Sequence, residues 1–102
     1  MKVVKLSHPN YEYDVHSLVK AFYAEDQVTV ITPETKPEKL AELEPQVSLE
    51  IELAETGAKI RVGEEDFLWD AEMETIADGY KNGLKRFLYR TLSKVTGQKL
   101  PW

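Results

Sequence analysis

Residues 47–62 constrain the fold more than any other part of the chain. In VSLEIELA apolar and polar residues alternate, and after a turn around residues 55–57 the segment AKIRV alternates in the same way. A period of two predicts two half-buried antiparallel strands. One register matches both faces of this hairpin. Its apolar pairs are Leu49 with Val62, Ile51 with Ile60 and Leu53 with Ala58, and its charged pairs are Glu50 with Arg61 and Glu52 with Lys59.

The N-terminal third predicts a strand, a helix and a second strand. KVVKL (residues 2–6) is a short strand that ends before His8-Pro9, because a residue that precedes proline avoids helical dihedral angles. From Tyr11 to Tyr23 apolar residues recur at helical spacing, and Asn10 is the expected N-cap. QVTVIT (residues 27–32) follows the acidic turn Glu25-Asp26 and is rich in β-branched residues. This order implies a right-handed parallel crossover.

Residues 33–45 predict an excursion on the surface. They hold three of the five prolines and six charged residues, so we expect at most one helical turn, around residues 38–43. This stretch is predicted to be the most dispensable part of the chain.

The C-terminal third predicts one more strand and a long helix. A second turn at residues 63–66 precedes FLWDAEM (residues 67–73), which is interpreted as a third meander strand, although it could instead begin the last helix. From about Glu74 a helical arc is expected, ended by Gly97 at the C′ position and followed by Pro101. The arc comprises Ile76, Tyr80, Leu84, Phe87, Leu88, Leu92 and Val95.

Together these elements predict one α+β domain over residues 1–102. We expect a two-layer sandwich in the order β-α-β-β-β-(β)-α, with a mixed sheet and two helices on one face. The N-terminus has no apolar run long enough for a signal peptide, and no stretch approaches the roughly 20 apolar residues of a membrane span. The expected location is therefore the cytoplasm, with no membrane partner.

The composition excludes several kinds of chemistry for this segment. The absence of cysteine removes disulfides, thiolate metal sites, iron–sulfur ligation and cysteine nucleophiles. His8 and His16 lack a nearby third ligand, so both are predicted to be solvent-exposed. The turn Glu64-Glu65-Asp66 lacks the alternating ligands of a calcium loop, and there is no nucleophile elbow or glycine-rich phosphate loop. We therefore assign no catalytic residue, metal ligand or cofactor to this segment.

Charge is distributed unevenly along the chain. Residues 1–78 hold all 18 acidic residues and seven of the 13 basic ones, a net charge of −11, whereas residues 79–102 carry +6. The basic helix either lies across the acidic body or faces an anionic partner, and Arg86, Arg90 and Lys94 share one ridge of it. Nucleic acid is disfavoured by a pI near 5.0 and by the lack of an aromatic platform. Gly79 and Gly83 form a G-x-x-x-G spacing. Such a spacing marks either a place where the helix closely approaches a neighbouring element or only the conformational cost of glycine in a helix.

The tail KNGLKRFLYRTLSKVTGQKLPW (residues 81–102) resembles the segment that precedes the radical-SAM core in the oxygen-independent coproporphyrinogen III oxidase-like family of Gram-positive anaerobes, the coproporphyrinogen dehydrogenases. In that family a K-N-x-x-K-x-x-x-Y helix is followed by T-G, by a tryptophan and then by G-x-L-T-G-I-R-P. The matching residues here are Lys81, Asn82, Lys85, Tyr89, Thr96, Gly97 and Trp102. The match covers about the last fifth of the chain, and the upstream elements are similar only in their order.

The resemblance implies a parent oxidoreductase of porphyrin biosynthesis. Such an enzyme binds a [4Fe–4S] cluster through C-x-x-x-C-x-x-C and uses S-adenosylmethionine. This chain has no cysteine and no L-T-G-I-R-P motif, so cluster and cofactor are expected in an absent downstream domain. We accordingly expect that the chain is truncated just before that domain, with Trp102 as the hinge to it.

The function implied by the resemblance is that of a non-catalytic N-terminal domain. Its expected partners are its own downstream catalytic domain, on which it packs or for which it orients substrate, and an anionic tetrapyrrole substrate. A substrate with several carboxylates favours planar basic donors. The predicted contact residues are Lys85, Arg86, Tyr89, Arg90 and Trp102. The alternative is a stand-alone binding module that uses its basic C-terminal helix, or an open sheet edge, for a protein or nucleic-acid partner.

Overall fold

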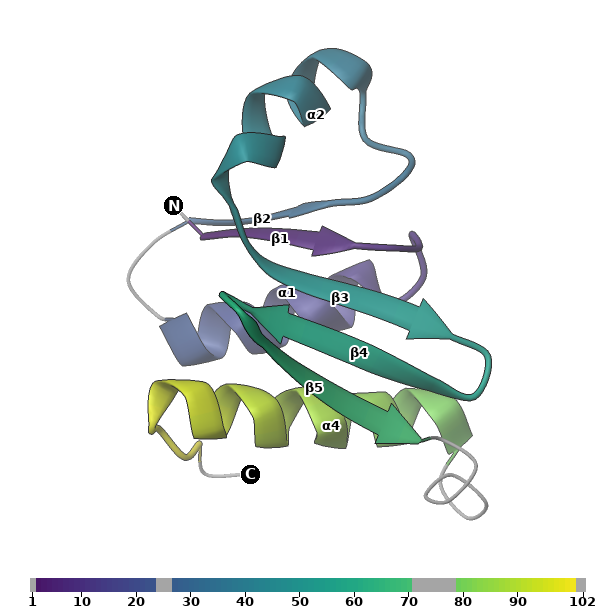
Figure 1. Cartoon of the computed structure of the whole chain (residues 1–102), viewed down its shortest axis with the longest axis vertical. Coiled ribbons are helices and arrows are strands. Elements are labelled where there is room, and N and C mark those ends of the chain that lie inside the picture. Colours follow the sequence, from purple (N-terminus) through teal and green to yellow (C-terminus); the bar gives the residue numbers. More distant parts are fainter. Residues whose placement is uncertain (1, 24–26, 71–78, 101–102) are drawn as a thin grey trace.

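The computed structural model describes residues 2–23, 27–70 and 79–100 and forms an α+β domain, as predicted. Figure 1 shows one sheet with α1 and α4 running along it and α2 set apart from them. The elements are β1 (Lys2–Leu6), α1 (Glu12–Tyr23), β2 (Val28–Ile31), α2 (Pro37–Leu43), the 3-10 turn η1 (Glu44–Gln46), β3 (Val47–Ala54), β4 (Gly57–Val62), β5 (Glu65–Asp70) and α4 (Gly79–Thr96).

The sheet is mixed, with the strand order β2-β1-β3-β4-β5. β1 is parallel to both of its neighbours, and β3, β4 and β5 form an antiparallel meander. All five residue pairs predicted for the hairpin occur in the observed register. The third meander strand is confirmed over residues 65–70, and residues 71–73 lie outside the described residues. Its turn is shorter than predicted, since Glu65 and Asp66 already belong to β5.

One face of the sheet carries the main core. Val4 and Leu6 of β1 pack in the same cluster as the buried residues of α1 and α4, so both predicted helices cover this face. The buried residues are Val15, Leu18, Val19 and Phe22 in α1 and Gly83, Leu84, Phe87, Leu88, Thr91 and Leu92 in α4. Burial of each large apolar side chain contributes about 1.5–3 kcal/mol. Val95 belongs to α4 as predicted, but it lies at the margin of the apolar arc, since 38% of it is exposed in the last turn of the helix.

Residues 33–45 are more structured than the sequence predicts. Instead of at most one turn, the chain forms the seven-residue helix α2, with Pro37 in its first turn, followed directly by η1. Leu43 is only 4% exposed and packs with Val3 and Ile31 in a second cluster. Because successive side chains of a strand point to opposite faces, Val3 and Val4 place α2 on the sheet face opposite α1. The burial of Leu43 argues against the prediction that this stretch is dispensable, which the stability of a Leu43 variant would test.

The helix ends differ slightly from the prediction. α1 begins at Glu12, so Tyr11 and not Asn10 occupies the position before the helix, where its carbonyl accepts the Val15 N–H at 2.9 Å. Tyr11 takes a left-handed φ of 66°. Gly97 ends α4 with φ 73° and donates to the Ser93 carbonyl at 2.9 Å, which confirms the C′ prediction. The predicted features at Glu25-Asp26, Glu74, Ile76, Pro101 and Trp102 lie outside the described residues.

Candidate functional site

A basic groove lies along α4. It encloses about 470 Å³ and its lining includes four of the five predicted contact residues, Lys85, Arg86, Tyr89 and Arg90, together with Asn82. These residues are spaced three and four apart, so successive turns of one helix place them side by side. Guanidinium and ammonium groups around a tyrosine ring suit a planar anion such as a carboxylate or a phosphate. Trp102, the fifth predicted contact residue, lies outside the described residues.

The acidic body engages the first half of this helix. Asp14 of α1 holds two lysines of α4, with its carboxylate oxygens 3.7 Å from Lys81 Nζ and 3.2 Å from Lys85 Nζ. The Asp14 side chain is only 18% exposed. The prediction that the basic helix lies across the acidic body is therefore confirmed for Lys81 and Lys85.

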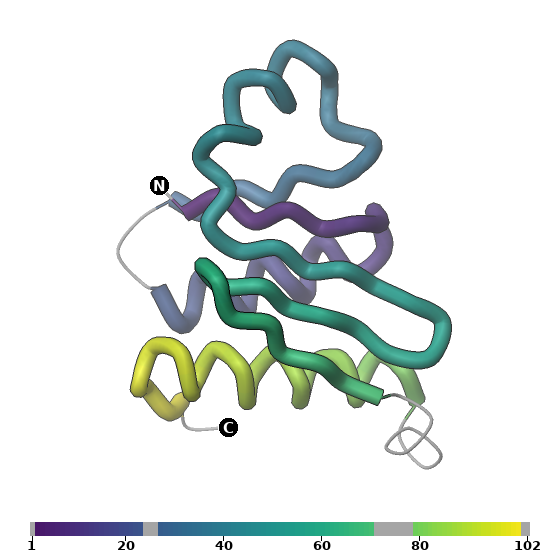
Figure 2. The backbone as a smooth tube through the Cα atoms, in the orientation of Figure 1, coloured from purple at the N-terminus to yellow at the C-terminus, as the bar shows by residue number. Residues whose placement is uncertain are grey.

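Tyr89 links α4 to the residues that follow it. Its hydroxyl donates to the Leu100 carbonyl at 2.7 Å and accepts the Leu100 N–H at 3.0 Å, while its ring meets Phe22 edge-on at 5.4 Å. Ser93 Oγ donates to the Gln98 carbonyl at 2.7 Å. We call residues 97–100 the exit segment, and Figure 2 shows it folding back beneath the end of α4. Tyr89 thus has a structural role besides lining the groove.

Thr96 adds a further contact to the exit segment. Its hydroxyl donates to the Leu92 carbonyl at 2.7 Å and accepts the Gln98 N–H at 3.2 Å. Lys94, which the sequence places on the ridge of Arg86 and Arg90, is not a lining residue of the groove. Its ammonium group lies 5.7 Å from the ring centroid of Phe67 in β5. The predicted three-residue ridge is therefore reduced to its two arginines at this site.

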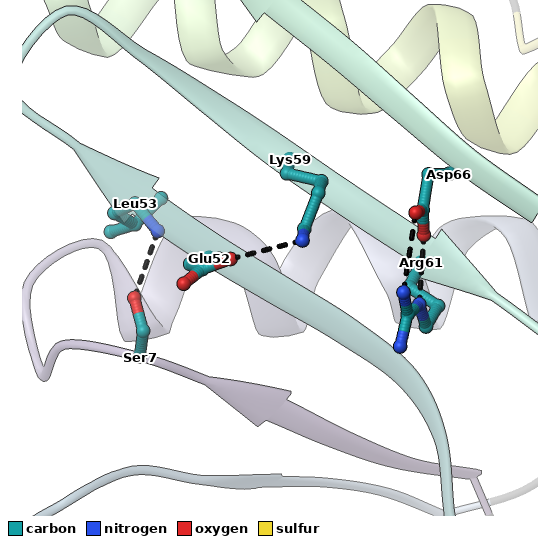
Figure 3. Close-up of polar contacts among 6 residues, drawn as sticks. All are labelled: Ser7, Glu52, Leu53, Lys59, Arg61 and Asp66. Carbon is teal, nitrogen blue, oxygen red and sulfur yellow. Dashed lines mark hydrogen bonds and ion pairs between the residues drawn. The ribbon is translucent and has the colours of Figure 1, made fainter.

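The opposite face of the sheet presents a second, smaller hollow of about 230 Å³. It is lined by Lys5, Ser7, Glu50, Ile51, Glu52, Lys59 and Arg61. Figure 3 shows part of this face, with Lys59 paired to Glu52 and Arg61 paired to Asp66. Lys5 pairs with Glu44 at 2.9 Å. Each of these three cations thus has a carboxylate neighbour within the domain.

The pair of Arg61 and Asp66 differs from the sequence prediction. Glu50 stands opposite Arg61 in the register, but the Arg61 side chain donates to both Asp66 carboxylate oxygens, at 2.8 and 3.2 Å. The hydrogen bond to Asp66 raises the pKa of Arg61, and the same bond lowers the pKa of Asp66. Similarly, the hydrogen bond to Glu44 raises the pKa of Lys5.

The two histidines have different surroundings. His8 is exposed as predicted, and its Nδ1 accepts the Asn10 N–H at 3.2 Å. The prediction is wrong for His16, which is half-buried with its Nε2 2.9 Å from the Val28 carbonyl. No sequence signal marks this contact, because it depends on how α1 crosses β2. Across residues 2–23, 27–70 and 79–100, no three acidic or histidine side chains gather as a metal site would require.

Fold and site define a small α+β domain with a basic groove on its C-terminal helix. None of its helices within the described ranges combines the length and apolar character needed to cross a membrane. Neither a scan against protein-family models nor a search of curated proteins finds a match to this chain.

Proposed function

We propose that this chain is the non-catalytic N-terminal domain of a radical-SAM oxidoreductase that resembles oxygen-independent coproporphyrinogen III oxidase. In this proposal it packs on the downstream catalytic core or orients substrate for it. The proposal rests on the similarity of residues 81–102 to the segment that precedes the core in that family. One structural observation supports it: several residues of the similar motif hold the exit segment in place.

The support comes from what the motif residues contact. Tyr89 bonds twice to Leu100, Thr96 bonds to the Gln98 N–H, and Gly97 provides the left-handed turn between them. Lys81 and Lys85 tie the same helix to Asp14 in α1. Together these contacts give the exit segment a set position relative to the domain body. A fixed exit is what a domain needs in order to hold a following domain in one orientation.

The first test is the reading frame of the gene. We expect it to continue beyond Trp102 into a core with C-x-x-x-C-x-x-C, and a stop codon directly after Trp102 would remove the proposal. Expressed by itself, the 102-residue chain should bind no iron and cleave no S-adenosylmethionine. Turnover by this chain alone would contradict a non-catalytic role.

The second test addresses the exit segment in the full-length protein. Tyr89→Phe removes the hydroxyl that bonds to Leu100, and we expect limited proteolysis near residues 97–102 to become several-fold faster while cluster content stays unchanged. Tyr13→Phe is the matched control, since Tyr13 is 82% exposed. We also expect lower porphyrinogen turnover for Tyr89→Phe than for Tyr13→Phe. Equal proteolysis and equal turnover of the two variants would argue against the orienting role.

A stand-alone binding module is the second candidate, favoured by the basic groove itself. In that case the isolated chain would be retained on RNA or DNA at low salt and released as salt rises, because neutralised phosphates release counterions. Arg86→Gln and Arg90→Gln would reduce retention, whereas Lys36→Gln in the turn before α2 would not. No retention at low salt would reject the nucleic-acid form of this candidate.

A further inference from the structure

The carboxyl ends of β1 and β3 mark a second place for a ligand, away from the basic groove. From β1 the chain crosses to β2 through α1 on one face of the sheet, and from β2 it returns to β3 through α2 on the other face. In open sheets with parallel strands, ligands bind in the crevice outside the strand ends where such connections diverge. In Figure 1 the arrowheads of β1 and β3 point to the same end of the sheet, where α1 and α4 also begin.

A cavity of about 500 Å³ lies at this position, and we call it the aromatic pocket. It is lined by His8, Asn10, Tyr11, Leu53, Ala54, Glu55 and Tyr80. It is thus formed by two elements, β3 and α4, together with the loop before α1 and the turn after β3, although β3 and α4 are far apart in the sequence. Convergence of apolar walls and a few polar groups is typical of small-molecule sites.

Two tyrosine rings form the wall of the aromatic pocket. The ring centroids of Tyr11 and Tyr80 are 5.7 Å apart with a 36° tilt. Tyr80 is held from behind by the ring of Trp69 at 5.2 Å, and its hydroxyl donates to the Gly57 carbonyl at 3.0 Å. Burial raises the pKa of the Tyr80 phenol, so this hydroxyl remains a neutral donor. The wall is therefore rigid before any ligand binds.

The backbone at Tyr11 is strained in support of this wall. Tyr11 is the one non-glycine residue with positive φ in the described part of the chain. A left-handed conformation costs a residue with a side chain about 1–2 kcal/mol. Such strain tends to occur where a fold positions a functional group. Here the conformation accompanies the placement of the Tyr11 ring beside Tyr80.

The charge of the aromatic pocket is opposite to that of the basic groove. Its one charged lining residue is the Glu55 carboxylate, and none of its described lining residues is lysine or arginine. Within the described ranges Glu55 takes part in no ion pair. An anion would therefore be repelled, whereas a cation gains from Glu55 and from the faces of the tyrosine rings.

We propose that the aromatic pocket binds a planar aromatic cation. Its ring packs on Tyr11 and Tyr80, and its charged nitrogen donates to the Glu55 carboxylate. An amidinium group suits this site best because its parallel N–H donors match both carboxylate oxygens.

The experiment compares two probes that share one ring and differ in charge. Benzamidine and benzoate are titrated separately into the ¹⁵N-labelled 102-residue chain at low salt. We expect benzamidine to shift the amide signals of Tyr11, Leu53, Ala54, Glu55 and Tyr80 in a saturable way, and benzoate to leave them unchanged. Equal binding of the two probes, benzamidine shifts confined to other residues, or no saturable shift would each overturn the proposal.

Variants then separate the two contacts. Glu55→Gln should weaken benzamidine binding about fivefold, the effect of losing one charge interaction near the surface. Glu64→Gln, the same change in the turn at the other end of β4, should leave it unaltered. Tyr11→Ala should weaken binding, while Tyr11→Phe keeps the ring and should preserve it. If Glu55→Gln binds benzamidine as tightly as the parent chain, the assignment of the charged contact is wrong.

Discussion

Replacement of Gly57 by alanine tests a close backbone approach between β4 and β5. A Cβ atom on Gly57 would lie 2.0 Å from the Trp69 carbonyl oxygen and 3.2 Å from the Trp69 carbonyl carbon, whereas real Cβ contacts stay above 3.0 Å. The obstacle is the backbone of the neighbouring strand, so no rotamer change relieves it. Either β4 or β5 must move by about 1 Å at the pair formed by Gly57 and Asp70.

The energetic cost follows from what such a movement disturbs. Overpacking of this kind typically costs about 1–3 kcal/mol. Trp69 is 5% exposed and its ring contacts both Tyr80 and Phe87, and each aromatic pair is worth about 0.5–1.5 kcal/mol. We therefore expect Gly57→Ala to lower the free energy of unfolding by about 2–4 kcal/mol. For a domain of this size that corresponds to a fall in Tm of roughly 10–25 °C.

Urea and thermal unfolding followed by far-UV circular dichroism would measure this loss. Gly63→Ala is the matched control, since nothing lies within 4 Å of its added Cβ and its φ of +63° costs only about 1–2 kcal/mol. We expect Gly57→Ala to be clearly the less stable variant. If both variants lose the same stability, β4 and β5 do not approach as closely as the structure shows, and the reasoning fails.

Three further perturbations probe other contacts. Leu43→Ala should lower the free energy of unfolding in urea by about 2–4 kcal/mol, because it leaves a cavity beside Val3 and Ile31. A loss below about 1 kcal/mol would support the prediction that residues 33–45 are dispensable. The hydrogen bond with Arg61 lowers the pKa of Asp66 in the folded state, so this carboxylate stabilises the fold above its unfolded pKa of about 3.9 and ceases to do so as pH falls through the lower folded pKa. The difference in stability between the parent chain and Asp66→Asn should therefore be present at pH 7 and vanish in strong acid. A difference that does not change with pH would contradict this reasoning. Ser7→Ala removes the acceptor of the Leu53 N–H, a bond of 2.8 Å, so hydrogen exchange of that amide should accelerate while exchange at Ile60 should not.

The register of the hairpin could be predicted because two independent patterns agree on it. Apolar pairs and charged pairs select the same alignment of β3 with β4. The partner of Arg61 could not be predicted in the same way, since Glu50 and Asp66 lie on the two strands that flank β4. The choice depends on side-chain geometry, which favours a two-point contact with Asp66. Sequence patterns identify neighbours across strands but do not rank them.

The outcome for α2 shows how composition can mislead. Prolines and charges favour a loop, but Pro37 stands in the first turn, where proline is well tolerated. The spacing of Leu40 and Leu43 was the available signal, since residues three apart share a helical face. Their burial depends on Val3 and Ile31, which a local pattern cannot place. In the same way, the sequence predicts Tyr89 as a contact residue without indicating that its hydroxyl bonds to Leu100.

The uneven charge of the chain leads to two surfaces of opposite character in one small domain. Asp14 pairs with Lys81 and Lys85 on the side of α4 that faces α1, and Arg86 and Arg90 add two further cations to the basic groove. Among the described residues that line the aromatic pocket, at the start of the same helix, the charged group is the Glu55 carboxylate. A ligand selected by one site is thus repelled or ignored by the other. This separation makes the two proposals independent, because loss of anion binding in the groove leaves the contacts of the pocket intact.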